Sequence, residues 1–138
     1  MPQLEQVFEQ NKNNVKVVFK NMPLSIHQFA EPSARAGLAA ARQGKFWEFH
    51  DALFSSGKLN DQSINTVATK IGLDLAMLQT DMNSAAIIEQ LAKDIKDAEL
   101  AGVRGTPTIF INGKKLKDRS PQGFQNLINE ELSLAGKK

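Results

Sequence analysis

Apolar residues recur every three or four positions along most of the chain, the spacing that places them on one face of a helix. Residues that favour helix ends stand at most boundaries of these stretches. The predicted helices span residues 1–10, 34–43, 45–54, 62–71, 75–82, 85–101 and 121–135. The predicted N-caps are Ser33, Asp61, Asp74, Ser84 and Ser120. We therefore expect a mostly helical chain.

Two stretches depart from the helical spacing and predict strands. Residues 15–19, within VKVVFK, form a nearly continuous β-branched and aromatic run, which is typical of a strand covered on both faces. Residues 108–111, TIFI, and 114–117, KKLK, flank Asn112 and Gly113, and Asn-Gly is the strongest short signal for a hairpin. We expect the first strand to lie inside a sheet and KKLK to lie at an exposed edge, where lysines are common.

The third predicted helix carries a broad apolar face. Its members are Phe46, Trp47, Phe49, Leu53 and Phe54. A face of this width is more often packed in a core than used for binding. We predict that these residues contribute to the hydrophobic core.

The composition is that of one globular domain: 138 residues, 41% hydrophobic and 23% charged. The formal charge of +2, without a basic patch, argues against nucleic-acid binding. No apolar run is long enough for a membrane span, and the first ten residues are too polar for the apolar part of a signal peptide. We expect the chain as given to be soluble.

The chain contains no cysteine, so it cannot form a disulfide, bind metal through thiolates or use a sulfur nucleophile. Other candidate sites are weak. His50 and Asp51 are adjacent and point to different sides of a helix, whereas a metal site needs three or four converging ligands. Ser33 stands in no serine-nucleophile motif, and the spacing of Gly102 and Gly105 matches no phosphate-binding loop. We predict no metal site, no cofactor and no catalytic residue in this chain.

Two separated stretches carry a resemblance to a known family. They are VVFKNMPLSIHQFAEPSARAGLAAARQGKFWEFHDALF and GVRGTPTIFING. In this order they resemble the DsbA-like thiol-disulfide oxidoreductases, with similarity over residues 15–132. The resemblance implies an α/β, thioredoxin-like fold of the DsbA type, as a single domain over residues 1–138. A helical block of about residues 33–101 would be inserted in it.

The resemblance also implies a binding site. It identifies Thr106 and Pro107 as the loop with a cis peptide bond, which in the family lies against the active-site disulfide. Thr106 would offer its backbone N–H and C=O to an extended protein or peptide client, in the manner of strand addition. Arg104 stands beside this loop, where a cation can stabilise a thiolate or contact a client, although a loop arginine in contact with water alone is the commoner case. Arg104, Thr106 and Pro107 are the candidate substrate-binding residues.

The sequence departs from the family at the catalytic motif. In the family, Cys-x-x-Cys opens the first helix after a first strand, and residues 1–10 here resemble the later part of that helix. The resemblance therefore implies an N-terminally truncated sheet that lacks its central strand. Three arrangements would close the gap: the two flanking strands pair directly, another copy donates a strand or swaps an element, or a segment outside this sequence fills it. We expect strand exchange or a homo-oligomer.

Three functional hypotheses follow. The chain resembles a protein disulfide oxidoreductase of the DsbA family that is redox-inactive as given, because it has no thiol. Alternatively, it is a non-catalytic peptide-binding or self-associating thioredoxin-like module, or a relative of the glutathione-transferase and isomerase branch of the fold. Members of the DsbA family are usually exported, so the resemblance suggests a periplasmic or exported location.

Overall fold

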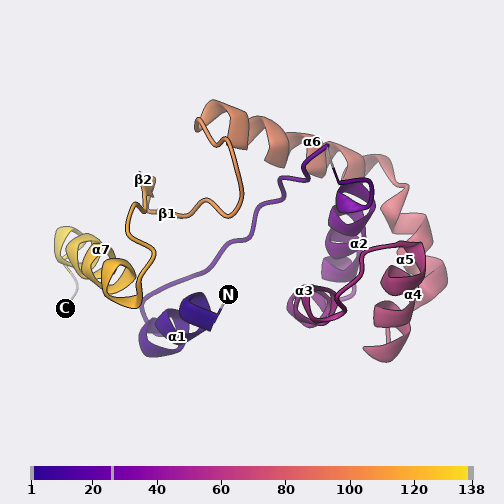
Figure 1. The fold of residues 1–138 in the computed structure, drawn as a ribbon, viewed down its shortest axis with the longest axis horizontal. Coiled ribbons are helices and arrows are strands. Elements are labelled where there is room, and N and C mark those ends of the chain that lie inside the picture. Colours follow the sequence, from indigo (N-terminus) through magenta and orange to yellow (C-terminus); the bar gives the residue numbers. More distant parts are fainter. Residues whose placement is uncertain (1, 26, 137–138) are drawn as a thin grey trace. The chain divides into compact units, whose positions relative to one another are not determined.

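The computed structural model describes residues 2–25 and 27–136, and most of them are helical (Figure 1). The elements are α1 (Pro2–Asn11), α2 (Ala30–Arg42), α3 (Phe46–Ser55), α4 (Asp61–Lys70), α5 (Leu75–Met82), α6 (Ala85–Leu100), β1 (Phe110–Ile111), β2 (Lys114–Lys115) and α7 (Pro121–Leu134). The chain divides into two compact units. Unit 1 comprises Met1–Phe19 and Val103–Lys138, and unit 2 comprises Lys20–Gly102. The helical block predicted over about residues 33–101 falls within unit 2.

Helix α2 is the centre of unit 2 and contacts α3, α4, α5 and α6. Its inward face consists of small residues, because Ala36, Ala39 and Ala40 are all fully buried. Small side chains allow close approach of helix backbones, so the larger side chains of the neighbouring helices fill the space around α2. The buried cluster comprises Ala36, Ala39, Ala40, Phe49, Leu53, Ile64, Val67, Ala68, Leu73, Leu78, Met82 and Ile87.

The helix N-termini confirm three predicted caps and correct two. The confirmed caps are Asp74, Ser84 and Ser120, each of which accepts a hydrogen bond from the backbone N–H three residues ahead. The predicted cap Asp61 is wrong. Asn60 accepts from the Ser63 N–H at 2.7 Å while the Ser63 hydroxyl accepts from the Asn60 N–H at 2.9 Å. This reciprocal pair satisfies two otherwise free donors, so the helix starts one residue earlier than predicted.

The predicted cap Ser33 is also wrong, because α2 begins at Ala30 and Ser33 lies in its first turn. Pro32 does not prevent this start. The first N–H groups of a helix have no partner within the helix, so a proline there loses no hydrogen bond. The backbone N–H of Ser33 donates to the C=O of Phe29 at 3.1 Å and closes the first turn.

The apolar face predicted on α3 is only partly buried. Phe49 and Leu53 are 1% and 7% exposed, whereas Trp47 and Phe54 are 45% and 76% exposed. Residues four positions apart lie on the same side of a helix, so Phe49 and Leu53 face the core together. Trp47 and Phe54 lie on another side of α3, and the prediction that they belong to the core is wrong.

The hairpin of unit 1 is confirmed, although its strands are shorter than predicted. Phe110 pairs with Lys115 and Ile111 with Lys114 in an antiparallel register. Both turn residues have positive φ, 49° at Asn112 and 82° at Gly113, as a two-residue turn of this type requires. One further bond follows outside the assigned strands, where the Leu116 N–H donates to the C=O of Ile109 at 2.8 Å.

The core of unit 1 is small. Its buried residues are Val7, Leu116, Phe124 and Ile128, which come from α1, the end of the hairpin and α7. A partly buried polar pair also joins α1 to α7. The Asn11 amide donates to Gln125 Oε1 at 2.8 Å, and the Gln125 amide donates back to Asn11 Oδ1 at 3.1 Å. Each amide thus satisfies the other, so the burial of Asn11 leaves both groups hydrogen-bonded.

Residues 15–19, predicted as a central strand, form no strand. Val18 is 65% exposed and Phe19 is 41% exposed, so the run is not covered on both faces. A strand exists only when a neighbour accepts and donates its backbone hydrogen bonds. Within residues 2–25 and 27–136, no second strand lies against this 15–19 segment, and its β propensity alone does not produce a strand.

Two aspartates of α6 hold the start of unit 2 in place. The buried Asp94 carboxylate accepts from the Asn21 backbone N–H at 3.1 Å, from the Asn21 amide at 3.1 Å and from the Gln90 amide at 2.9 Å. The more exposed Asp97 carboxylate accepts from Lys20 at 2.7 Å and from Lys93 at 2.9 Å. The chain at Lys20 and Asn21 is therefore fixed to α6 by side-chain contacts rather than by secondary structure.

Asp97 provides a test of this arrangement by pH. The hydrogen bond from Lys20, and then that from Lys93, lower the pKa of Asp97 from 3.8 to about 2. Because the folded pKa lies below the unfolded value, this contribution to stability is fully present above about pH 4. It is lost as the pH falls through about 2. We expect an NMR titration of the Asp97 side-chain carbon to have its midpoint near 2, and Lys20→Ala to raise that midpoint toward 3.8. A wild-type midpoint at the ordinary value would show that the ion pairs do not form in solution.

Candidate functional site

The loop before β1 presents two of the predicted site residues at the surface. The peptide bond between Thr106 and Pro107 is cis, and both residues are exposed. The Thr108 hydroxyl donates to the C=O of Gly105 at 2.6 Å and so bridges the base of the loop. This hydrogen bond joins the residues on either side of Thr106 and Pro107, which lie exposed at the tip of the loop.

The backbone of Thr106 is available for hydrogen bonding. In the part of the chain that the structure describes, neither its N–H nor its C=O has a hydrogen-bond partner. The C=O of Ile109 faces β2, where it accepts from Leu116. Because successive residues of a strand direct their backbone groups to opposite edges, those of Thr108 and Phe110 face away from β2. The loop and β1 together thus present an open edge, which we call the 106–110 edge.

Arg119 is a site residue that the sequence interpretation missed. Its Nη1 donates to the C=O of Pro107 at 3.4 Å. The hairpin register could have revealed it, because extending the pairs of Phe110 with Lys115 and Ile111 with Lys114 places residue 119 opposite residue 106. Arg104, which was predicted, lies exposed two residues before Thr106. No hydrogen bond or ion pair joins Arg104 to another described residue.

The charges around this loop are mostly positive. Arg104, Lys117 and Arg119 are exposed, and Asp118 is the acidic residue among them. The Ser120 backbone N–H, which donates to Asp118 at 2.9 Å, lowers the pKa of that carboxyl. The Ser120 hydroxyl in turn caps α7 by accepting from the Gly123 N–H at 3.0 Å. The site thus combines free backbone donors and acceptors with cationic side chains, a combination suited to holding an extended peptide.

Elsewhere in the described chain, fewer side chains are arranged in a way that suits binding or catalysis. His50 Nδ1 lies 3.0 Å from Asp51 Oδ1, so the prediction that these two side chains point to different sides of the helix is wrong. The centroid of the His50 ring lies 4.5 Å from that of the Phe54 ring. No group of three or more His, Asp or Glu side chains converges to hold a metal among the residues that the structure describes. None of the described helices is long and apolar enough to cross a membrane.

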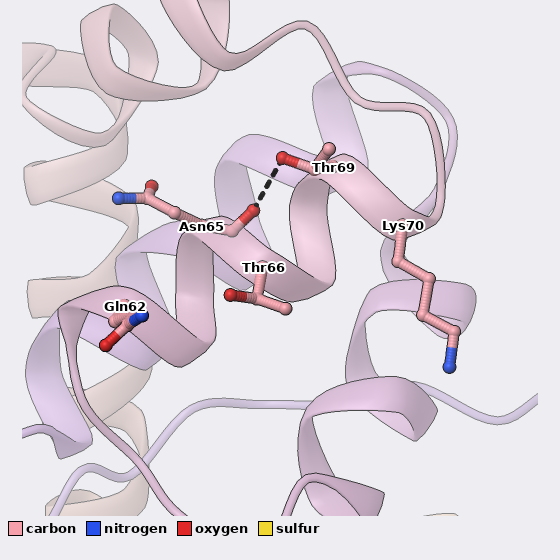
Figure 2. A pocket seen from close by; sticks show the side chains of 5 residues that line it. All are labelled: Gln62, Asn65, Thr66, Thr69 and Lys70. Carbon is pink, nitrogen blue, oxygen red and sulfur yellow. Dashed lines mark hydrogen bonds between the residues drawn. The ribbon is translucent and has the colours of Figure 1, made fainter.

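A surface depression lies along α4 in unit 2 (Figure 2). All of its lining residues come from this one helix, and none is acidic. They are Gln62, Asn65, Thr66, Thr69 and Lys70. The Thr69 hydroxyl is already used, since it donates to the C=O of Asn65 at 2.9 Å. Convergent polar groups from several elements are the usual mark of a binding site, and this depression lacks them.

Both the sequence and the structure of this chain are similar to those of known proteins. A family model described as a DSBA-like thioredoxin domain matches residues 30–129. A thioredoxin-like oxidoreductase from Silicibacter pomeroyi DSS-3 has a similar structure, with a TM-score of 0.87 and 27% identity, over 96% of this chain and 77% of that one. The thiol-disulfide exchange protein alpha-DsbA2 from Wolbachia pipientis shares the fold, with a TM-score of 0.79 and 22% identity, over 94% of this chain and 72% of that one.

Similarity in sequence extends to parts of much longer proteins. A protein named as Na(+)/H(+) antiporter NhaA 1 of Salinispora arenicola is 35% identical over 104 residues, which cover 74% of this chain and 16% of the antiporter. One named as Na(+)/H(+) antiporter NhaA of Herminiimonas arsenicoxydans is 32% identical over 106 residues, or 76% of this chain and 17% of the antiporter. This chain therefore spans less than a fifth of the length of these curated relatives.

Proposed function

Because this chain belongs to the DSBA-like thioredoxin domain family, we propose that it binds an extended segment of another polypeptide along the 106–110 edge and performs no disulfide exchange with its own residues. The family fold supports the first part of this proposal. The residue composition supports the second, because the chain has no thiol.

The observation that carries the binding proposal is the free backbone of Thr106. An N–H and a C=O that are exposed and unpaired can each bond to an incoming strand, and β-augmentation obtains much of its affinity from such main-chain bonds. Pro107 cannot donate, so pairing to the loop depends on Thr106 and continues at Thr108 and Phe110. Phe110, 39% exposed, offers an apolar contact on the same stretch.

The positive charges give the site a preference among peptides. Arg104 and Arg119 flank the edge, so a segment with Asp or Glu residues gains attraction, whereas a basic segment is repelled. The preference is expected to weaken as salt screens these exposed charges. The client class that we propose is therefore an extended acidic segment with apolar side chains in alternation.

The test is titration of the isotope-labelled protein with a short acidic peptide, followed by NMR. We expect the amide signals of Thr106, Thr108 and Phe110 to move, with those of α4 as an internal control. N-methylation of the peptide at a backbone nitrogen that faces the edge should abolish binding, while N-methylation of the next residue should not. This alternation distinguishes strand addition from contact through side chains alone.

Charge variants sharpen the same test. Arg119→Ala and Arg104→Ala are each expected to weaken binding of the acidic peptide about two- to fivefold at low salt, the range for an exposed charge pair. Arg42→Ala, which removes a charge from unit 2, is the matched control and should leave the affinity unchanged. Unmoved signals at the 106–110 edge, or N-methyl effects without alternation, would refute the binding proposal.

The redox part is tested separately. Disulfide exchange requires a thiolate as nucleophile, and none of the 138 residues is cysteine. With a reduced, unfolded client in glutathione buffer, we expect the chain to leave the rate of disulfide formation at that of the buffer alone. Acceleration that depends on the concentration of the chain would contradict this part.

A further inference from the structure

The backbone is unpaired in the middle of the 15–19 segment. In the described part of the chain, the N–H and C=O groups of Lys16, Val17 and Val18 have no hydrogen-bond partner, and Val18 is 65% exposed. Val15 packs against the core of unit 1, so the segment is held at one end while its next residues remain open. An exposed run of β-branched residues with free backbone groups is a template for pairing with another chain.

The sequence of this segment is complementary to itself. When two copies pair antiparallel about Val17, Val17 lies opposite the same residue of the second copy, and Val15 lies opposite Phe19 of the second copy. These pairs share one face, which is wholly apolar. A pair of an aromatic and a β-branched residue on neighbouring strands is stabilising. On the other face, each Lys16 lies opposite a Val18, so no lysine lies opposite a lysine.

Other registers are less favourable. A parallel in-register pairing places Lys16 opposite Lys16, and an antiparallel pairing about Val18 places Lys16 opposite Lys20, which are both like-charge contacts. If the antiparallel register is shifted by one residue from the pairing about Val17, Val15 lies opposite Lys20 and Phe19 lies opposite Lys16. The apolar face of one copy then meets the lysines of the other. Side-chain chemistry therefore favours the register about Val17.

We propose that two copies of this chain associate through antiparallel pairing of their 15–19 segments about Val17. The interface has two-fold symmetry, so each contact away from the axis occurs twice and the association closes at a dimer. In an antiparallel pair only alternate residues exchange backbone hydrogen bonds, so Lys16 of each copy bonds to Val18 of the other, and the two Val17 residues face each other as a pair without hydrogen bonds. The residues of the 106–110 edge take no part in this pairing. The association does not depend on peptide binding.

Val18 allows a direct test of the register. It is exposed, and in the paired state it lies opposite Lys16 of the second copy. Val18→Glu creates two opposite-charge pairs by symmetry, and Val18→Lys creates two like-charge pairs. We expect Val18→Glu to strengthen dimerisation about 2- to 30-fold at low salt, and Val18→Lys to weaken it by a similar factor. The dissociation constant is measured by sedimentation equilibrium and light scattering over a range of protein concentrations.

Val18→Pro is the second variant. It removes a backbone N–H that has no partner within the described chain, so the helical circular dichroism and the thermal midpoint should remain those of the wild type. The dimer should nevertheless be lost, because the Val18 N–H of each segment can no longer donate to the Lys16 C=O of the other copy. A wild-type chain that is monomeric at every concentration would overturn the proposal. Equal effects of Val18→Glu and Val18→Lys, or an unweakened dimer in Val18→Pro, would also overturn it.

Discussion

Asp94→Ala is expected to lower the free energy of unfolding of unit 2 by about 3–5 kcal/mol, measured by chemical denaturation. The carboxylate is 4% exposed and accepts three hydrogen bonds. Its removal leaves the buried Asn21 backbone N–H and the Asn21 amide without an acceptor, whereas the exposed Gln90 amide can bond to water instead. A buried donor without a partner costs about 1–3 kcal/mol, so the loss exceeds that of one average hydrogen bond.

Asp97→Ala is the matched control, on the same helix and three residues further. Asp97 makes two ion pairs, but its side chain is 34% exposed, and water can replace the lost contacts. We expect a much smaller loss of stability. Asp94→Asn, which keeps the size but replaces one acceptor oxygen by a donor group, should fall between the two. If Asp94→Ala and Asp97→Ala were equally mild, the buried network would not hold the start of unit 2.

Phe124→Ala is expected to destabilise unit 1 by about 3–5 kcal/mol, the usual cost of truncating a buried phenylalanine. Phe124 is 2% exposed and is the largest member of a core whose other buried residues are Val7, Leu116 and Ile128. A core of this size has few neighbouring side chains that can move into the resulting cavity. Native-state hydrogen exchange should show faster exchange of the amides of α1 and α7.

Phe49→Ala makes the same chemical change in unit 2, where Phe49 is 1% exposed. It should accelerate exchange in α2 and α3 first, so the two variants are expected to give opposite patterns. Each cluster belongs to its own compact unit, and local stability follows the contacts within such a unit. If both variants accelerated exchange equally throughout the chain, the two cores would unfold as one cooperative unit.

Local sequence patterns predicted the helices and the hairpin well because these elements depend mainly on nearby residues. The N-caps Asp74, Ser84 and Ser120 bond to backbone groups three residues away, and the positive φ values at Asn112 and Gly113 belong to the turn itself. The predicted cap is one residue late at Asp61 and four residues late at Ser33. These errors arose where two adjacent residues could each start the helix, or where a proline was compatible with a first turn.

The candidate site was predictable in part. The motif around Thr106 and Pro107 identified the loop from the resemblance to the family, and the structure places both residues at the surface. Arg119 was missed, because it reaches Pro107 only through the pairing of the hairpin. The buried acceptor Asp94 gave no signal either, since its partner Asn21 lies 73 positions earlier in the sequence.

The amino-acid sequence by itself determined the helical periodicity, the hairpin turn and the absence of thiol chemistry, because each follows from residue identity and short spacing. Only the tertiary structure decided which apolar residues are buried and whether the β-prone 15–19 segment becomes a strand. Trp47 and Phe54 share the chemistry of Phe49 but lie on another side of α3, and burial depends on what packs against that side. A strand likewise requires a partner for its backbone groups, and within the described part of one chain no second strand lies against residues 15–19.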